Sequence, residues 1–408
     1  MGFYKNLICL GMFGFLTACG GSGGGGSAPA SSAASSGTLA SSTVVVSSST
    51  ATSTSLPSSS SLLSSSSSSV GLPANRNLTH ARWSFDTKAK VRSTAVISSD
   101  AVIFGTDSGT LYALSRDNGS EQWRVDTGGA ISSHLLLIDG KVIFLNYSGK
   151  IMALDARSGT QVWSKTVGSE YLRPWGHHLA SAIAVDDRIY IGTSSGKVYG
   201  LAHATGAEVW SIDIKSAVHT RPALVNGTLF VSSDSAVHAL DIAAGKQLWS
   251  RQFNNPTSPA VADNTLVVGS RDARVFGLDA STGADRWNIA HGPDWVTGDP
   301  VILDGIAYIG SSDDKKYQAI NLVSGALAWE IGTGGNVFAK PVFHGDVSYI
   351  SAGDSYATPG SGRVSAVTKA GKVLWTLSGK NFFASPVVDG ESVYIGSDDG
   401  YFYAFPAF

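Results

Sequence analysis

The chain has 408 residues, of which 15% are charged, and a formal net charge of −2. Such a balance gives no global field that would recruit nucleic acid or an anionic membrane. Its two cysteines, Cys9 and Cys19, both lie in the first twenty residues, which excludes a disulfide framework, a zinc cluster or a cysteine nucleophile from the rest of the chain. The nine histidines include no H-E-x-x-H motif, so the sequence predicts no metal site.

The N-terminus has the features of an export signal. Lys5 precedes the apolar run LICLGMFGF, and LTAC follows at Leu16 to Cys19. This arrangement resembles a bacterial lipoprotein signal, in which residues 1–18 are removed and Cys19 carries the acyl chains. The resemblance implies a lipid anchor, and Gly20 after the cysteine favours the outer membrane. Secretion of a soluble protein is the alternative.

Residues 19–77 are predicted to be a flexible tether. They are rich in Gly and then almost pure in Ser, so they cannot bury enough apolar surface to offset the entropy of ordering. A Gly/Ser chain of this length has a root-mean-square reach of roughly 40 Å.

From residue 78 to 408 one pattern repeats. Segments such as LYALSRDNGSEQW, IMALDARSGTQVW and VFGLDASTGADRW recur every 38 to 47 residues. Short strands at this period, without helical periodicity, predict an all-β propeller with one four-stranded antiparallel blade per repeat. The C-terminal unit lacks a tryptophan strand, which ARWSFDT near the start supplies. We therefore expect eight blades, with Arg82 to Phe85 pairing with Tyr401 to Phe405 to close the ring.

The recurring tryptophans are expected to fill the gaps between blades, where a large ring can be buried between twisted sheets. These eight residues are Trp83, Trp123, Trp163, Trp210, Trp249, Trp287, Trp329 and Trp375.

Inner strands line the channel of a propeller, so the residues just before them are expected at its mouth. Aligning the repeats places Ser93, Ser133, Ser181, Arg221, Ser258, Asp299, Lys340 and Ser385 at one position. Two interpretations remain open for Arg221, Asp299 and Lys340. Asp299 and Lys340 form an ion pair that keeps the blades in register, or the charges bind a small anionic or polar ligand over the channel.

Two long connections enlarge the same face, SEYLRPWGHHLASA and AHGPDWVTGDP. Aromatic, basic and imidazole side chains on loops above a rigid scaffold are typical of recognition surfaces. The alternative is that Trp175 and Trp295 fold down as plugs. The binding candidates here are Tyr171, Leu172, Arg173, Trp175, His177, His178 and Trp295. A third insertion, after Gly353, is expected to lie away from this face.

The repeat, with its A-x-D-x-x-[ST]-G-x-x-x-W core, resembles the PQQ-like (quinoprotein) propeller repeat over residues 79–408. Among lipoproteins it resembles the BamB family, accessory subunits of the outer-membrane β-barrel assembly machine. This resemblance implies an envelope protein as the partner and draws attention to Leu172 and Arg173, because a Leu-Arg loop contributes to partner binding in that family. Quinoprotein dehydrogenases clamp their cofactor with adjacent cysteines and Ca²⁺. The body here has no cysteine, so no cofactor is expected.

The sequence thus predicts a lipid-anchored, non-catalytic protein-binding propeller that faces the periplasm or the cell surface. One alternative is a polysaccharide-binding lipoprotein, with Trp175 and Trp295 stacking on sugars. Another is an enzyme of lyase or dehydrogenase type, in which Tyr171 and one of His177 and His178 act as acid and base.

Overall fold

The computed structural model describes residues 76–77, 80–172, 176–354 and 362–407. The chain divides into two units, Met1–Ser68 and Ser69–Phe408, and the described residues all belong to the second. Cys19 and most of the predicted tether lie outside them. The described residues contain no helix that could span a membrane.

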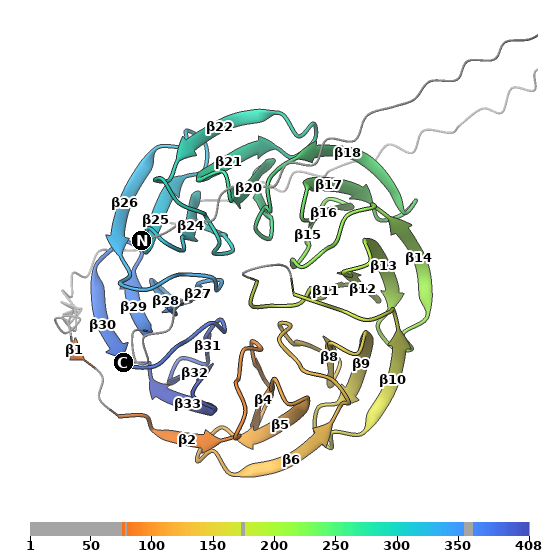
Figure 1. Cartoon of the computed structure of the whole chain (residues 1–408), viewed down its shortest axis with the longest axis vertical. Coiled ribbons are helices and arrows are strands. Elements are labelled where there is room, and N and C mark those ends of the chain that lie inside the picture. The colour runs from red at the N-terminus through yellow and green to blue at the C-terminus, as the bar shows by residue number, and fades with distance from the viewer. Residues whose placement is uncertain (1–75, 78–79, 173–175, 355–361, 408) are drawn as a thin grey trace, which may run out of the picture. The chain divides into compact units, whose positions relative to one another are not determined.

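Eight blades of four antiparallel strands stand in a ring, as Figure 1 shows, and one of them gains a fifth, parallel strand at its outer edge. This confirms the predicted eight-bladed propeller. Blade 1 holds β3 (Val96–Ile97), β4 (Ala101–Gly105), β5 (Thr110–Ser115) and β6 (Glu121–Asp126). Blade 2 holds β7 (Leu136–Ile138), β8 (Lys141–Leu145), β9 (Lys150–Asp155) and β10 (Gln161–Thr166). Blade 3 holds β11 (Ile183–Val185), β12 (Arg188–Gly192), β13 (Lys197–Ala202) and β14 (Glu208–Asp213). Blade 4 holds β15 (Ala223–Val225), β16 (Thr228–Ser232), β17 (Ala236–Asp241) and β18 (Lys246–Gln252).

The second half of the ring repeats the arrangement. Blade 5 holds β19 (Ala260–Ala262), β20 (Thr265–Ser270), β21 (Arg274–Asp279) and β22 (Asp285–Ala290). Blade 6 holds β23 (Val301–Leu303), β24 (Ile306–Gly310), β25 (Lys316–Asn321) and β26 (Leu327–Gly332). Blade 7 holds β27 (Val342–His344), β28 (Val347–Ala352), β29 (Arg363–Thr368) and β30 (Val373–Ser378). Blade 8 holds β31 (Val387–Val388), β32 (Ser392–Gly396), β33 (Tyr401–Pro406) and, from the N-terminal side, β2 (Trp83–Asp86).

The recurring tryptophans lie at the boundaries between blades. Each indole Nε1–H donates to a backbone carbonyl of the next blade, at 2.8 to 3.3 Å. Each of the first seven rings also packs on a turn glycine of that blade. A Cβ on Gly206, for example, would lie 2.5 Å from the ring of Trp163. Because Gly206 also has a φ of +71°, both the space and the backbone require glycine.

The ring is closed by β2, which pairs antiparallel with β33. Trp83 opposes Ala404 and Asp86 opposes Tyr401, which confirms the predicted pairing of the two ends. A second strand from the N-terminal side, β1 (Arg76–Asn77), falls within the predicted tether yet pairs parallel with β30.

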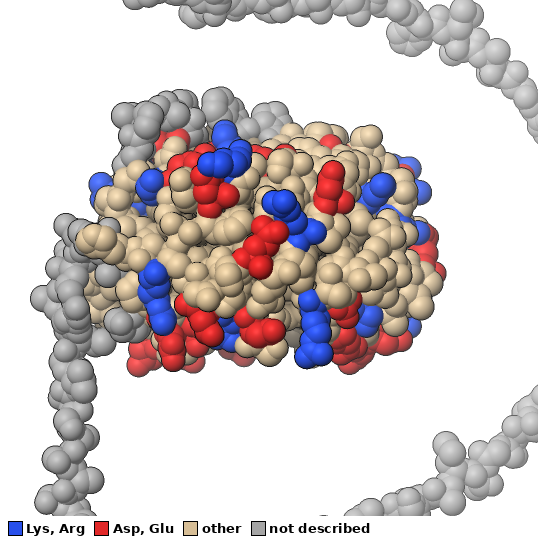
Figure 2. Space-filling model, turned by 90° about the horizontal axis from the view of Figure 1, so that it is seen from below, with Lys and Arg blue, Asp and Glu red and all other residues tan. Residues whose placement is uncertain are grey.

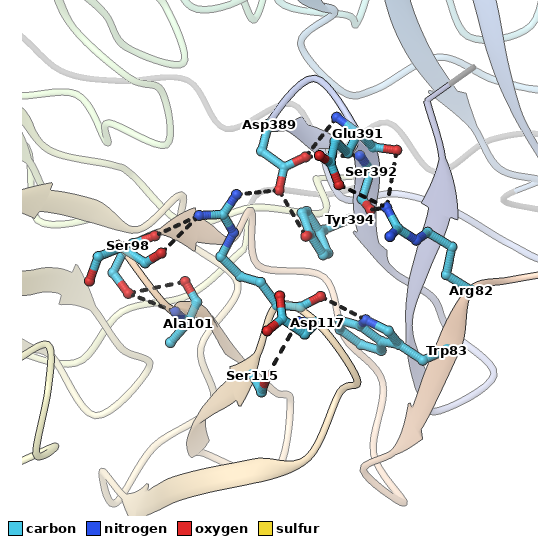
Figure 3. A network of polar contacts seen from close by, with 12 residues as sticks. Arg82, Trp83, Ser98, Ala101, Ser115, Asp117, Asp389, Glu391, Ser392 and Tyr394 are labelled. Atoms are coloured by element: carbon cyan, nitrogen blue, oxygen red, sulfur yellow. Dashed lines mark hydrogen bonds and ion pairs between the residues drawn. The ribbon is translucent and has the colours of Figure 1, made fainter.

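A polar network reinforces the closure, as Figure 3 shows. Arg116 of blade 1 forms a 2.5 Å ion pair with Asp389 of blade 8, and the Tyr394 hydroxyl donates to the same carboxylate at 2.9 Å. Arg82 donates to the Ser392 hydroxyl at 2.7 Å. Burial alone would raise the pKa of Asp389, but Arg116 and the Ser392 and Tyr394 donors outweigh it and lower that pKa to about 2.

All inner strands begin at one face of the ring, which we call the mouth face. In an antiparallel blade the turn between the second and third strands returns to the end where the first strand begins. The described flanks of the insertion after Gly353, which was expected to lie away from this face, are therefore at the mouth face. Gly353 exchanges backbone hydrogen bonds with Asn336, and the Asp354 N–H donates to Asn381, so its described flank contacts the connections into β27 and β31. Residues 355–361 lie outside the described part.

Candidate functional site at the channel mouth

Eight equivalent residues, each two positions before an inner strand, surround the channel at the mouth. They are Thr94, His134, Ser181, Arg221, Ser258, Asp299, Lys340 and Ser385, which we call the mouth ring. The sequence alignment was wrong by one residue in blades 1 and 2, where it chose Ser93 and Ser133. Those two hydroxyls instead donate to the carbonyls of Gly105 and Leu145 in the second strands, at 2.8 and 2.9 Å.

A relay of hydrogen bonds links neighbours in the mouth ring. The backbone N–H of one residue donates to the side-chain oxygen of the next at 2.8 to 3.3 Å. The relay runs from His134 to Ser181, from Arg221 to Ser258, from Ser258 to Asp299, from Lys340 to Ser385 and from Ser385 to Thr94. The three interruptions fall where the next side chain is His134, Arg221 or Lys340. Arg and Lys carry no acceptor, so the relay cannot continue there.

Asp299 serves this relay and forms no ion pair with a cation among the described residues. Its Oδ1 accepts the Ser258 N–H at 2.8 Å. Among the described residues, no ion pair within 4.0 Å joins it to Lys340 or Arg221. Burial lowers the pKa of Arg221, and it lowers the pKa of Lys340, with the charge of Arg221 adding to the effect. The proposed register-keeping ion pair between Asp299 and Lys340 is therefore absent from the structure.

Below the mouth ring the channel opens into two cavities of about 330 and 220 Å³. Arg221 and Lys340 line both cavities, and Asp299 lines the larger one. The remaining walls come largely from the inner strands and the prolines that precede them. Two cations, from blades 4 and 7, thus line the same two cavities.

The connection from β10 to β11 covers the mouth, and Figure 1 shows it reaching the centre of the ring. His178 bridges from this connection to two other blades. Its Nε2 lies 2.9 Å from the Phe383 carbonyl before β31, and its Nδ1 lies 3.1 Å from the Ser132 carbonyl before β7. Burial lowers the pKa of His178, although both carbonyls oppose that shift. We call the described residues 176–179 the cap.

His177 occupies an apolar position in the cap. Its ring stacks on Phe383 at 4.1 Å between centroids and meets Phe338 edge-on at 4.4 Å. Burial, with a contribution from the charge of Arg92, lowers its pKa to about 2. Both ring nitrogens are buried without a hydrogen-bond partner among the described residues. Beneath the cap remains a cavity of only about 40 Å³, which is room for a few water molecules.

The base of the same connection is held rigidly while Tyr171 stays exposed. The buried Glu170 carboxylate accepts from the Ser194 N–H and hydroxyl at 2.8 and 2.7 Å, and burial raises its pKa. Ser194 Oγ accepts from the Tyr171 N–H at 3.2 Å, while Leu172 packs half-buried on the core. The Tyr171 side chain is 51% exposed and meets His219 edge-on. Tyr171 is thus near His219, whereas His177 and His178 contact other groups.

Arg173 and Trp175, two of the predicted binding residues, lie outside the described part of the chain. Trp295, the other predicted aromatic, is half-buried on the mouth face. The Arg271 guanidinium lies over its ring at 4.5 Å from the centroid, and its carbonyl accepts from Ser312. Arg271 thus covers one face of the indole ring.

The sequence did not reveal several residues of the mouth. Phe338 and Phe383 hold His177, His134 stands in the mouth ring with its ring 5.2 Å from that of His178, and Arg92 lies over Phe383 at 5.2 Å. Arg92 also forms a two-point ion pair with Asp398 at 2.6 and 2.8 Å. Correct alignment of blade 2 would have found His134, but the other contacts join distant repeats. No group of three His, Cys, Asp or Glu suited to a metal ion occurs among the described residues.

Comparisons with known proteins agree with this architecture. A family model described as "Outer membrane protein assembly factor BamB" matches residues 75–289 and 233–407. A protein of that name from Moranella endobia is 27% identical over 172 residues, covering 38% of this chain and 43% of the relative. A 1-butanol dehydrogenase (cytochrome c) from Thauera butanivorans is 32% identical over 120 residues, covering 24% of this chain and 17% of the relative.

The matched stretches therefore span less than half of either relative's length. Among solved structures, BamB from Moraxella catarrhalis superposes with a TM-score of 0.58 at 21% identity, over 73% of this chain and 85% of the other. At that identity the superposition shows the propeller fold alone.

Proposed function

Because the chain belongs to the family described as outer membrane protein assembly factor BamB, we propose that it is a non-catalytic scaffold that binds a protein partner through its mouth face. The proposed partner is a component of the machinery that assembles outer-membrane β-barrel proteins. The proposed location is the outer membrane, with Cys19 as the lipid anchor and residues 19–77 as the tether.

The observation that carries the proposal is the exposed Tyr171 on its rigid base. Protein-binding surfaces use aromatic residues held in place before the partner arrives, because less side-chain and loop entropy is then lost on binding. Glu170 and Ser194 fix the backbone on either side of the tyrosine, and Leu172 anchors the connection to the core. The exposed ring stands beside the cap, on the face that the long connections enlarge.

The mouth also favours a role without the quinone of the dehydrogenase relatives. Directly beneath the cap the mouth holds a cavity of only about 40 Å³. The body offers no adjacent cysteines to clamp such a group. We therefore propose that the chain acts without a quinone cofactor.

Site-specific photocrosslinking tests the proposal. The full chain, with its leader, is expressed in its native envelope with a photoreactive phenylalanine at Tyr171, or at Leu248 as the control. Leu248 is also 51% exposed, but it lies on the outer strand β18. We expect barrel-assembly components to crosslink from position 171 and not from position 248. Equal crosslinking from both positions, or from neither, would contradict the docking role.

Polysaccharide binding is a second candidate, favoured by Trp295 on the same face. Trp295 is half-buried, with Arg271 over one side of its indole, and in this alternative the other side stacks on a sugar ring. This function predicts that the chain is retained on insoluble glycans and that Trp295→Ala abolishes retention. Retention that persists in Trp295→Ala excludes this tryptophan as the stacking platform.

A further inference from the structure

The central channel holds two cations for which the described residues provide no partner. Neither Arg221 nor Lys340 makes an ion pair within 4.0 Å or a side-chain hydrogen bond with the described residues. On the outer surface, by contrast, basic and acidic side chains are interspersed (Figure 2), and pairs such as Arg251 with Asp285 join neighbouring blades. The two channel cations therefore lack the nearby carboxylate partners that basic side chains have on the outer surface.

The mouth ring adds backbone donors beside these cations. In the relay, each N–H points at the side chain of the next blade's equivalent residue. Ser181 and Asp299 occupy the positions in the mouth ring that precede Arg221 and Lys340. Neither N–H has a hydrogen-bond acceptor among the described residues. Each cation is thus accompanied by an N–H group that lacks an acceptor.

We propose that Arg221 and Lys340 bind a small dianion with carboxylate or phosphate oxygens inside the central channel. Arg221 offers a planar fork of donors that matches such oxygens in two-point contact, while Lys340 offers a compact charge from the opposite side. The two cavities that both residues line measure about 330 and 220 Å³, and the larger one is within the range of small-molecule sites, roughly 300–1,000 Å³.

Electrostatics inside the channel support the site. Burial disfavours both charges, and the charge of Arg221 further disfavours the charged form of Lys340. Asp299 counters these effects only in part, since the pKa of both cations stays below its ordinary value despite the negative charge of that carboxylate. A bound dianion would neutralise both cations and supply acceptors for the unpaired donors. This site is independent of the docking role proposed for Tyr171. The binding test below and the crosslinking test above can therefore fail separately.

Binding of phosphate and of succinate, measured by calorimetry on the full chain, tests the proposal. Native mass spectrometry first establishes that the purified chain is empty. We expect saturable binding of at least one probe, and the preferred probe identifies the oxyanion as phosphate or dicarboxylate. Arg221→Gln and Lys340→Met should each weaken binding by about tenfold or more, the effect of losing a charge-assisted hydrogen bond. Lys246→Met, which removes the same charge from the exposed strand β18, should leave affinity unchanged.

Thermal unfolding without ligand shows whether each variant is folded, and circular dichroism of the double variant provides a second check. Absence of binding of both probes to the empty wild-type chain would overturn the proposal. Binding that is equally strong in Arg221→Gln, Lys340→Met and Lys246→Met would also overturn it, because the anion would then lie elsewhere.

Discussion

Trp163 shows how a single residue joins two blades. Its side chain is 7% exposed, and its Nε1–H donates to the His203 carbonyl at 2.9 Å. We expect Trp163→Ala to cost about 3–5 kcal/mol of stability, as large-to-small changes in cores do. Trp163→Phe should cost less, about 1–3 kcal/mol, because it mainly leaves the carbonyl without its donor. Urea unfolding measures both. The neighbouring Val162→Ala, 47% exposed on the same strand, should change stability by no more than about 0.5 kcal/mol.

Asp389 makes the closure of the ring sensitive to acid. Its folded-state pKa of about 2 lies below the ordinary value of 3.8, so the ionised form is the one that stabilises the fold. This contribution is present above pH 4 and is lost as pH falls from about 4 to about 2. Asp389→Asn should reduce stability at pH 7 by on the order of 2 kcal/mol. The difference from wild type should shrink toward zero near pH 2 in urea unfolding. A difference that is constant across this range would show that the charge of Asp389 does not contribute.

At the scale of an element, the cap is predicted to loosen in mild acid. His177 has a pKa of about 2 in the closed cap and about 6.5 when an open cap exposes it to water. The open cap therefore binds a proton that the closed cap excludes. Closure is therefore favoured above pH 6.5 and weakens as pH falls below it, by up to about 2 kcal/mol at pH 5. Arg92, Lys90 and His178 are the charged or titratable groups that act on this ring.

Hydrogen exchange of residues 176–181 at pH 7.5 and 5.0, corrected for intrinsic rates, measures the opening of the cap. His177→Phe is the matched variant, because a phenyl ring keeps the stack on Phe383 and does not titrate. We expect acid to lower protection in wild type and to have a much smaller effect in His177→Phe. The same loss in both chains would assign the effect to other groups, such as His178 or His134.

The blades could be predicted from the sequence, whereas the cap could not. Each blade repeats the same local signals, a turn glycine and a tryptophan such as Gly206 and Trp163, so one alignment fixes eight elements at once. The cap depends on contacts between repeats, since His178 meets a carbonyl 205 residues away at Phe383. The mouth ring falls between these cases. Its charged members Arg221, Asp299 and Lys340 were aligned correctly. His134 was missed because the adjacent Ser133 was aligned with the serines that other blades have at this position.

At the level of the whole molecule, a single junction between β2 and β33 closes the eight blades into a ring. Asp86 of β2 opposes Tyr401 of β33, and Asp126 opposes Thr110 at the equivalent position within blade 1. A disulfide at the first pair closes a loop of more than 300 residues, and one at the second closes a loop of about 15. Loop entropy predicts a stabilisation of about 6 kcal/mol for Asp86→Cys with Tyr401→Cys, against about 3 kcal/mol for Asp126→Cys with Thr110→Cys. Both are made in the chain beginning at Arg76, which lacks Cys9 and Cys19, and urea unfolding is compared with and without reductant. A larger gain from the first disulfide would show that β2 and β33 separate in the unfolded state. Equal gains would mean that the two ends of the ring stay close together in the unfolded state.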